Sequence, residues 1–174
     1  MIDSFKNTLH NADCFNVLPN IPAKSIDLIL CDLPYEIVDC HWDKALSLEK
    51  LWNQYQRIIK DTGIIVLTAS QPFTSKLVCS NLDWFKYEWV WMKEQGKNFA
   101  LSKKQPLKIT ESILVFYKEF NTYNPQDLTK LEVPIIKSNK RKGSNLNHIR
   151  GHVKREYYNQ EFTNYQINLL YLYC

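Results

Sequence analysis

Residues Ser25 to Tyr35 read S-I-D-L-I-L-C-D-L-P-Y, an apolar run that ends in an acid, a Leu-Pro pair and a tyrosine. A strand more often continues into a turn of Gly, Asn or Ser. Here a carboxylate (Asp32), a rigid proline (Pro34) and a flat ring (Tyr35) come together where the strand would end. The Asp32 carboxylate and the Leu33 carbonyl can each accept a hydrogen bond from an N–H group. The stretch therefore indicates a chemical site rather than a plain turn.

The elements around this stretch predict a βαβ unit. Residues 25–31 form a short apolar run, and residues 63–70 (G-I-I-V-L-T-A-S) form a continuous one of the type that is buried on both faces of a parallel sheet. Between them, residues 46–60 carry apolar side chains at steps of three and four, the spacing of an amphipathic helix. Asp43 or Ser47 would cap the start of that helix. A strand, a helix and a strand in this order form a βαβ unit.

Further segments predict the rest of the sheet. Residues 84–93 and 111–118 are rich in aromatic and branched side chains, which predicts two strands, antiparallel to each other, at the far edge of the sheet. Residues 8–13 are expected to form a short strand and residues 14–18 a helical turn. Residues 126–156 are polar, basic and weakly periodic, which predicts a surface loop or a mobile segment.

Length and charge point to one domain with a local basic surface. The chain has 174 residues, 45% hydrophobic and 23% charged, and a net charge of +4. These values are typical of a globular protein with a single core. One stretch without acidic residues carries seven basic side chains, and the rest of the chain is net negative. The basic residues are Lys137, Lys140, Arg141, Lys142, Arg150, Lys154 and Arg155. Such a stretch favours an anionic partner.

The cysteines and the apolar runs restrict the setting of the protein. Five cysteines without C-x-x-C spacing favour reduced thiols in a cytoplasmic protein. The N-terminal residues lack the apolar core of a signal peptide, and no apolar run approaches the ~20 residues of a membrane span. A zinc site built from Cys31, Cys40, His41 and Asp43 is conceivable, but these spacings fit no recurrent zinc pattern, so we predict no metal site.

These residues resemble a known family, the amino-methylating DNA methyltransferases that use S-adenosyl-L-methionine. The likeness is to the permuted branch, in which the catalytic half precedes the cofactor-loop half. Asp32–Tyr35 (D-L-P-Y) is similar to the catalytic D-P-P-Y, and residues 11–14 (N-A-D-C) resemble a G-D-C segment that helps to hold the cofactor. Residues 111–117 with Y-N-P-Q at 123–126 resemble a later strand and its tail. The resemblance covers about residues 8–126.

The chain departs from the family pattern at several positions. Leu33 replaces the first proline of D-P-P-Y, Glu36 follows the tyrosine where glycine is frequent, and Ala12 replaces a glycine. The family normally closes with an F-x-G-x-G cofactor loop, whereas this chain has four glycines and no G-x-G. Residues 164–171 resemble the strand just before that loop, and the chain then ends at Cys174. We therefore expect a chain truncated before its cofactor loop.

The resemblance implies a role for each residue of the tetrapeptide. The exocyclic amine of adenine is a poor nucleophile, because its lone pair is delocalised into the ring. Asp32 and the Leu33 carbonyl would accept its two N–H bonds, favour a tetrahedral nitrogen and assist the loss of the extra proton. Pro34 would stiffen the turn, and Tyr35 would stack on a base flipped out of the duplex. The alternative is that Asp32 caps a turn, Pro34 ends a strand and Tyr35 packs on it.

The same resemblance assigns the binding residues. Asp13, Cys14 and Asp32 would bind S-adenosyl-L-methionine, although Asp13 is equally suited to cap residues 14–18 as a short helix. The seven basic residues lie where the family keeps its target-recognition region, so we expect them to contact the phosphates of duplex DNA. The interleaved side chains Asn139, Asn145, Asn147 and His148 would read base edges. The alternative for this stretch is a solvated loop.

The fold implied is α/β: a partial Rossmann-like methyltransferase sheet, mostly parallel, with an antiparallel edge hairpin. We expect a catalytic methyltransferase region at 1–126, a basic target-recognition-like region at 127–160, and the truncated start of the cofactor-loop half at 161–174. The implied activity is transfer of a methyl group from S-adenosyl-L-methionine to adenine N6 in duplex DNA. Because the cofactor loop would be missing, the chain is expected to be inactive alone.

Three alternatives remain open. The chain could be a non-catalytic, DNA-binding remnant, or one half of a split methyltransferase in which a second polypeptide supplies the cofactor loop. It could also act on RNA or on a protein amide. The acid at position 32 disfavours the protein amide, because asparagine accompanies that activity in similar folds.

Overall fold

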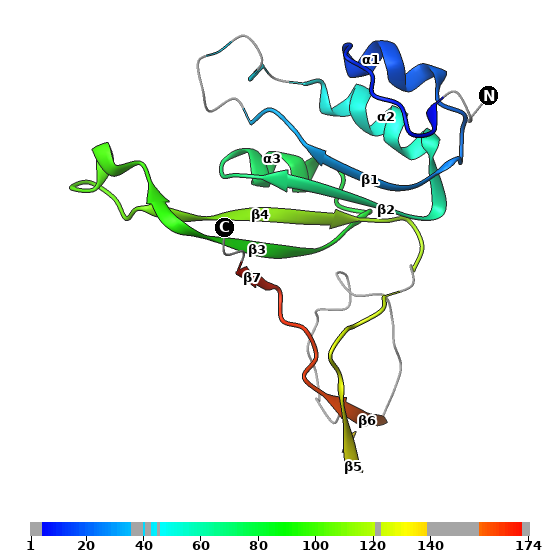
Figure 1. The fold of residues 1–174 in the computed structure, drawn as a ribbon, viewed down its shortest axis with the longest axis vertical. Coiled ribbons are helices and arrows are strands. Elements are labelled where there is room, and N and C mark those ends of the chain that lie inside the picture. The colour runs from blue at the N-terminus through cyan, green and yellow to red at the C-terminus, as the bar shows by residue number, and fades with distance from the viewer. Residues whose placement is uncertain are drawn as a thin grey trace. The chain divides into compact units, whose positions relative to one another are not determined.

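The protein is described by a computed structural model, which covers residues 5–35, 40, 43–44, 46–120, 123–138 and 157–171. The chain divides into two compact units, one made of Met1–Thr122 with Asn168–Cys174 and the other of Tyr123–Ile167. Figure 1 traces both units along the chain.

The first unit is built on a five-stranded sheet with the order β1-β2-β4-β3-β7. The strands are β1 (Ile26–Asp32), β2 (Ile59–Ala69), β3 (Phe85–Lys97), β4 (Lys108–Phe116) and β7 (Leu169–Tyr171). The pairs β1–β2 and β3–β7 are parallel, whereas β2–β4 and β3–β4 are antiparallel. The chain therefore has a partial Rossmann-like sheet, as predicted, with the β3–β4 hairpin on the side away from β1 and the short β7 outside it.

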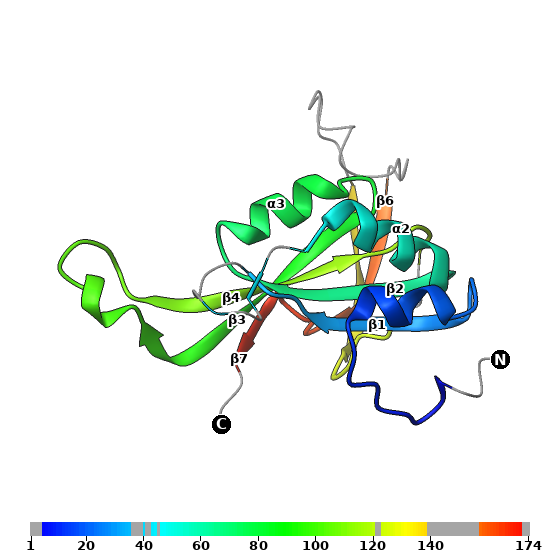
Figure 2. The same ribbon diagram turned by 90° about the horizontal axis from the view of Figure 1, so that it is seen from above.

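The described part of the same unit contains three α-helices: α1 (Cys14–Val17), α2 (Leu48–Ile58) and α3 (Phe73–Ser80). Figures 1 and 2 show α2 and α3 over the same face of the sheet. Helix α2 begins after Ser47, whose hydroxyl accepts the backbone N–H of Lys50. Of the two predicted caps, Ser47 is therefore the one that this helix uses.

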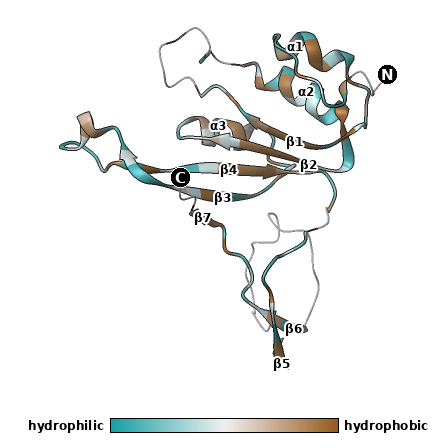
Figure 3. Cartoon of the chain, in the orientation of Figure 1, coloured by the Kyte–Doolittle hydropathy of each residue, from teal (hydrophilic) through white to brown (hydrophobic). Residues whose placement is uncertain are grey.

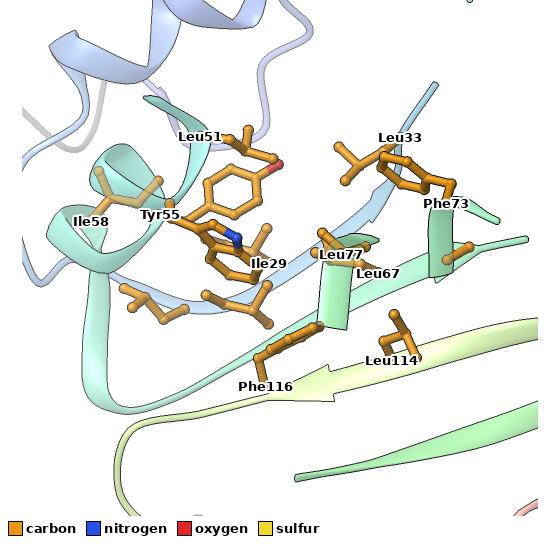
Figure 4. Packing of buried hydrophobic residues seen from close by; sticks show 14 residues of the cluster. Ile29, Leu33, Leu51, Tyr55, Ile58, Leu67, Phe73, Leu77, Leu114 and Phe116 are labelled. Atoms are coloured by element: carbon orange, nitrogen blue, oxygen red, sulfur yellow. The ribbon is translucent and has the colours of Figure 1, made fainter. Parts of the chain in front are cut away.

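The core lies between these helices and the sheet. Helix α2 buries Leu51, Trp52, Tyr55 and Ile58, which follow one another at the steps predicted from the sequence. Their partners in the cluster include Ile29 of β1, Ile65 and Leu67 of β2, Leu77 of α3, and Leu114 and Phe116 of β4. Figure 4 shows this packing and Figure 3 the apolar stretches of the strands. Each such side chain contributes roughly 1.5–3 kcal/mol relative to an exposed one.

The second unit contains a two-stranded antiparallel sheet of β5 (Thr129–Ser138) and β6 (Tyr157–Thr163). Two side-chain hydrogen bonds join the first residues of this unit to its last residues. The Tyr123 hydroxyl donates to Oε1 of Gln166 over 3.0 Å, and Nδ2 of Asn164 donates to the carbonyl of Asp127 over 2.8 Å.

Several local predictions were wrong. Residues 8–13 do not form a strand, because no described strand lies beside them to complete a ladder. Residues 129–138, which lie within the predicted loop of residues 126–156, form a strand, because residues 157–163 supply its backbone partners. Helix α3 was not predicted, although Phe73 and Leu77 lie one turn apart and are both buried.

The predicted βαβ unit of β1, α2 and β2 is confirmed. Among the described residues, no helix is long and apolar enough to cross a membrane. The three predicted regions along the chain remain a prediction.

Candidate active site

The site begins with a contact between two neighbouring strands. β1 and β2 are parallel, and Asp32 is the register partner of Thr68. Both residues therefore lie at the carboxyl edge of the sheet, where open α/β sheets bind their ligands. Oγ1 of Thr68 donates a hydrogen bond to Oδ1 of Asp32. The carboxylate is thus held by a side chain from the adjacent strand.

Tyr35 completes a cluster of three side chains. Its hydroxyl oxygen lies 2.6 Å from Oδ1 of Asp32 and 2.7 Å from Oγ1 of Thr68. Burial is the largest cause that raises the pKa of Tyr35, followed by its hydrogen bond to Asp32, while Thr68 acts in the opposite direction. The phenol therefore stays protonated and donates a hydrogen bond to the carboxylate.

The arrangement leaves one oxygen of the carboxylate for a ligand. The two bonds of the cluster that Asp32 accepts both reach its Oδ1, and no described residue donates to its Oδ2. Asp32 is exposed. An anchored carboxylate with one exposed acceptor oxygen is suited to bind an amino group.

Leu33 and Tyr35 fix the tetrapeptide to the core. The side chain of Leu33 is 5% exposed and belongs to the same cluster as Phe73 (Figure 4). The Tyr35 ring stacks on Phe73, with centroids 5.7 Å apart and an interplanar angle of 26°. The leucine that departs from the family pattern is therefore a core residue. Its predicted role needs only its backbone carbonyl.

Asp13 has the geometry of a helix cap, the alternative to cofactor binding given above. Its Oδ1 accepts the backbone N–H of Phe15 over 2.8 Å, which makes Asp13 the N-cap of α1. Burial, and then the nearby charges of Asp13 and Cys31, raise the pKa of Cys14. Cys14 at the start of α1 therefore lies within electrostatic reach of Cys31, the residue before Asp32 on β1.

The carboxylates of Asp13 and Asp32 suit part of the predicted cofactor. S-adenosyl-L-methionine presents hydroxyl and amino donors, and the carboxylates of Asp13 and Asp32 are both exposed acceptors. The cap bond uses only Oδ1 of Asp13. These two residues would hold the donors of the cofactor.

Sequence reasoning missed the polar side chains that β2 and the β3–β4 hairpin add to this edge. Thr68 and Ser70 close the otherwise apolar run of residues 63–70, and that contrast was the available signal. Nζ of Lys108 donates to Oγ of the buried Ser70. Lys93 pairs with Glu111.

The predicted DNA-binding residues are only partly described. The backbone of Lys137 belongs to β5. Lys140, Arg141, Lys142, Arg150, Lys154 and Arg155 lie outside the described residues, as do the four interleaved side chains predicted to read bases. Glu36 and His41 are also outside them. These assignments remain predictions.

Comparisons with known proteins match the chain to DNA methyltransferases. The type II methyltransferase M.HinfI from Haemophilus influenzae is 32% identical over 53% of this chain and 33% of its own length. The solved structure of M1.HpyAVI in complex with SAM has a TM-score of 0.52 at 20% identity, over 70% of this chain and 60% of its own. PvuII DNA methyltransferase has a TM-score of 0.50 at 12% identity, over 62% and 48%. No family model matches the chain.

The match spans about a third of M.HinfI and about half to 60% of the two solved chains. The solved structures show the fold, and the fold alone does not distinguish the target base, because the PvuII enzyme is described as cytosine-N4-specific. The relation to M.HinfI, the shared fold and the D-L-P-Y site agree with one another. The resemblance to DNA methyltransferases predicted from the sequence is thereby confirmed, and the chain is similar to part of these enzymes.

Proposed function

We propose that this chain carries the catalytic site of a DNA methyltransferase that modifies adenine N6 in duplex DNA. The observation that carries the proposal is the cluster of Asp32, Thr68 and Tyr35 at the carboxyl edge of β1 and β2. S-adenosyl-L-methionine, when bound, supplies the electrophilic methyl group. The chain supplies the acceptors that prepare the amine.

The chemistry follows from the orientation of the carboxylate. With Oδ1 held by Thr68 and Tyr35, Oδ2 of Asp32 accepts one N–H bond of the exocyclic amine, and the carbonyl of Leu33 accepts the other. Two acceptors outside the ring plane favour a tetrahedral nitrogen and free its lone pair. When the nitrogen gains the methyl group it also carries an extra proton, and Asp32 assists the departure of that proton.

The acid at position 32 supports adenine over cytosine, because the adenine-modifying relatives carry an acid at the first position of the tetrapeptide. Tyr35 presents an aromatic ring to the base, with Phe73 against that ring. We further propose that the seven basic residues between 137 and 155 contact DNA phosphates, and that the protein acts in the cytoplasm.

Product analysis tests the proposal. The purified chain is incubated with unmethylated duplex DNA and S-adenosyl-L-methionine, and the nucleosides are identified by mass spectrometry. The proposal predicts N6-methyladenine with the wild type, whereas the sequence led us to expect an inactive chain. It predicts the same product with the control Asp83→Ala, which removes an exposed carboxylate of the turn before β3. Asp32→Ala should form none. N4-methylcytosine as the product would contradict the adenine assignment.

A second candidate is one half of a split methyltransferase, and β1 supports it. This strand is the edge of the sheet among the described residues, with Leu28 56% and Leu30 70% exposed. Apolar residues at an open edge are suited to pair with another strand. No comparison supports a second polypeptide, so this candidate is a prediction. It requires that the chain alone form no methylated product and that a chain carrying the cofactor loop restore it.

A further inference from the structure

The β3–β4 hairpin extends past the candidate active site. Ser112 of β4 is the register partner of Ala69, the last residue of β2. Residues 108–111 and the connecting residues 98–107 therefore lie beyond the end of β2. At about 3.4 Å per residue, Lys108 lies roughly 14 Å past that end. Figure 1 shows the hairpin reaching beyond the arrowheads of β1 and β2, on the edge that holds Asp32.

The hairpin carries an excess of positive charge. Four lysines lie between residues 97 and 108, namely Lys97, Lys103, Lys104 and Lys108. Lys97 is 65% exposed and lies 3.9 Å from Glu111, a carboxylate that also pairs with Lys93. Lys103 and Lys104 are exposed, and neither forms an ion pair with any described residue. The end of the hairpin is therefore suited to an anionic partner.

An apolar aromatic side chain accompanies these lysines. Phe99 is 77% exposed and opens a short 3-10 turn, Phe99–Leu101, after Asn98 in the left-handed conformation at φ 67°. Leu101 and Leu107 are each 40% exposed. A phenylalanine in water among lysines contributes little to folding, whereas it can stack on a base or insert at a base step.

The stem of the hairpin is fixed to the sheet edge. Lys108 donates to the hydroxyl of Ser70, which is 5% exposed, and Lys93 pairs with Glu111. At Gly96 the strands approach so closely that an added Cβ would lie 2.8 Å from Cβ of Leu107. The stem of the hairpin is thus anchored next to the end of β2, the strand beside Asp32.

We propose that this hairpin is a second contact for duplex DNA, separate from the basic stretch at 137–155. Lys97, Lys103 and Lys104 would bind phosphates on the strand beside the target base, and Phe99 would insert at a neighbouring base step. The proposal rests on the proposed function, because that function supplies the duplex at Asp32. It adds the element that holds the duplex against that edge.

The charge is tested by the salt dependence of binding. Fluorescence anisotropy with a labelled 20-base-pair duplex is measured at several salt concentrations for wild type and for Lys103→Gln/Lys104→Gln. The magnitude of the negative slope of log K against log salt should decrease by about 1.8, since each of the two lost phosphate contacts contributes about 0.9. The matched control Lys50→Gln/Lys86→Gln removes two exposed lysines, one on α2 and one at the opposite end of β3. Its slope should equal that of the wild type.

The aromatic side chain is tested separately. Phe99→Ala should weaken duplex binding about tenfold without changing the salt slope, because a base contact displaces no phosphate counterions. Phe99→Trp should retain the affinity. Phe120→Ala removes a phenylalanine that is 81% exposed and follows the other end of β4, and this change should have no effect.

Neither measurement depends on methyl transfer, so the two proposals fail in different ways. The proposed function alone would be contradicted if neither the wild type nor any variant methylated DNA while the hairpin variants still bound duplex differently from their controls. The hairpin proposal is contradicted if the hairpin variants bind like their controls, if the wild type binds no duplex at 50 mM salt, or if the effects appear with single-stranded RNA and not with the duplex.

Discussion

Thr68 donates a hydrogen bond to Asp32 from the register position directly beside it on the neighbouring parallel strand. The bond fixes which oxygen of the carboxylate is occupied and which one has no donor among the described residues. Hydrogen bonds to charged groups are among the stronger ones in proteins. Thr68 is therefore a positioning residue, because it acts on the amine through Asp32.

Thr68→Val should reduce the rate of methyl transfer by about tenfold to a hundredfold, since it removes a hydrogen bond to a carboxylate without a change in side-chain shape. Thr68→Ser restores the hydroxyl and should recover most of the rate. The loss should appear in kcat rather than in KM. The control Thr62→Val changes an exposed threonine near the start of β2. Equal rates of methyl transfer for Thr68→Val and wild type would show that Thr68 does not position Asp32 for the reaction.

Leu33→Ala should lower the free energy of unfolding by about 2–4 kcal/mol, because the side chain is buried in the core and leaves a cavity. Leu33→Met should cost less than about 1.5 kcal/mol. Urea denaturation measures both. Because the predicted role of Leu33 uses only its carbonyl, the folded Leu33→Met protein should show the wild-type rate. A strong loss of rate in a stable Leu33→Met protein would contradict that division of roles.

Tyr55 predicts a loss of stability in alkali. Burial raises the pKa of this phenol above its ordinary value of 10.0, and Cys31 beside it adds to the rise. Below pH 10 the folded and unfolded chains both keep the proton of Tyr55, so the contribution of Tyr55 to the free energy of unfolding is fully present there. Above pH 10 the unfolded chain releases it first, so the free energy of unfolding falls by up to about 1.4 kcal/mol per pH unit.

The contribution of Tyr55 is isolated by Tyr55→Phe, which removes the ionisable group and keeps the ring. Urea denaturation between pH 8 and 11 should show a smaller decline for Tyr55→Phe than for wild type. Parallel declines in the two proteins would show that the Tyr55 phenol titrates alike in the folded and unfolded chains.

The exposed edge of β1 predicts self-association. Leu28 and Leu30 are exposed on the same face of an edge strand, so Leu28→Lys/Leu30→Lys should leave the free energy of unfolding within about 0.5 kcal/mol of wild type. Charged residues on an edge oppose strand pairing. Light scattering should therefore show less aggregation for the double variant. Severe destabilisation would mean that these leucines are needed by the fold itself.

Local patterns predicted much of the first unit. The spacing of Leu51, Tyr55 and Ile58 predicted α2, and the apolar runs predicted β1 and β2, because each of these features reports burial directly. The tetrapeptide at Asp32 was found because its acid, proline and tyrosine follow a strand without the usual turn residues.

The rest depended on contacts between distant segments. Thr68 becomes part of the site only through the register of β1 and β2, which the sequence does not state. The strands β5 and β6 depend on each other for backbone hydrogen bonds across a long separation along the chain. Phe99 was not singled out, because an exposed aromatic residue becomes visible only when burial is known.

The most direct test of the account is calorimetric titration of the purified chain with S-adenosyl-L-methionine, with Asp32→Ala and the control Asp83→Ala beside it. If Asp32 is an acceptor in the cofactor and substrate site, the wild type and Asp83→Ala should bind alike and Asp32→Ala should bind at least tenfold more weakly. Equal binding by all three proteins would contradict the assignment of this edge of the sheet as a methyltransferase site. No binding by any of them would contradict the proposal that this chain alone holds the cofactor.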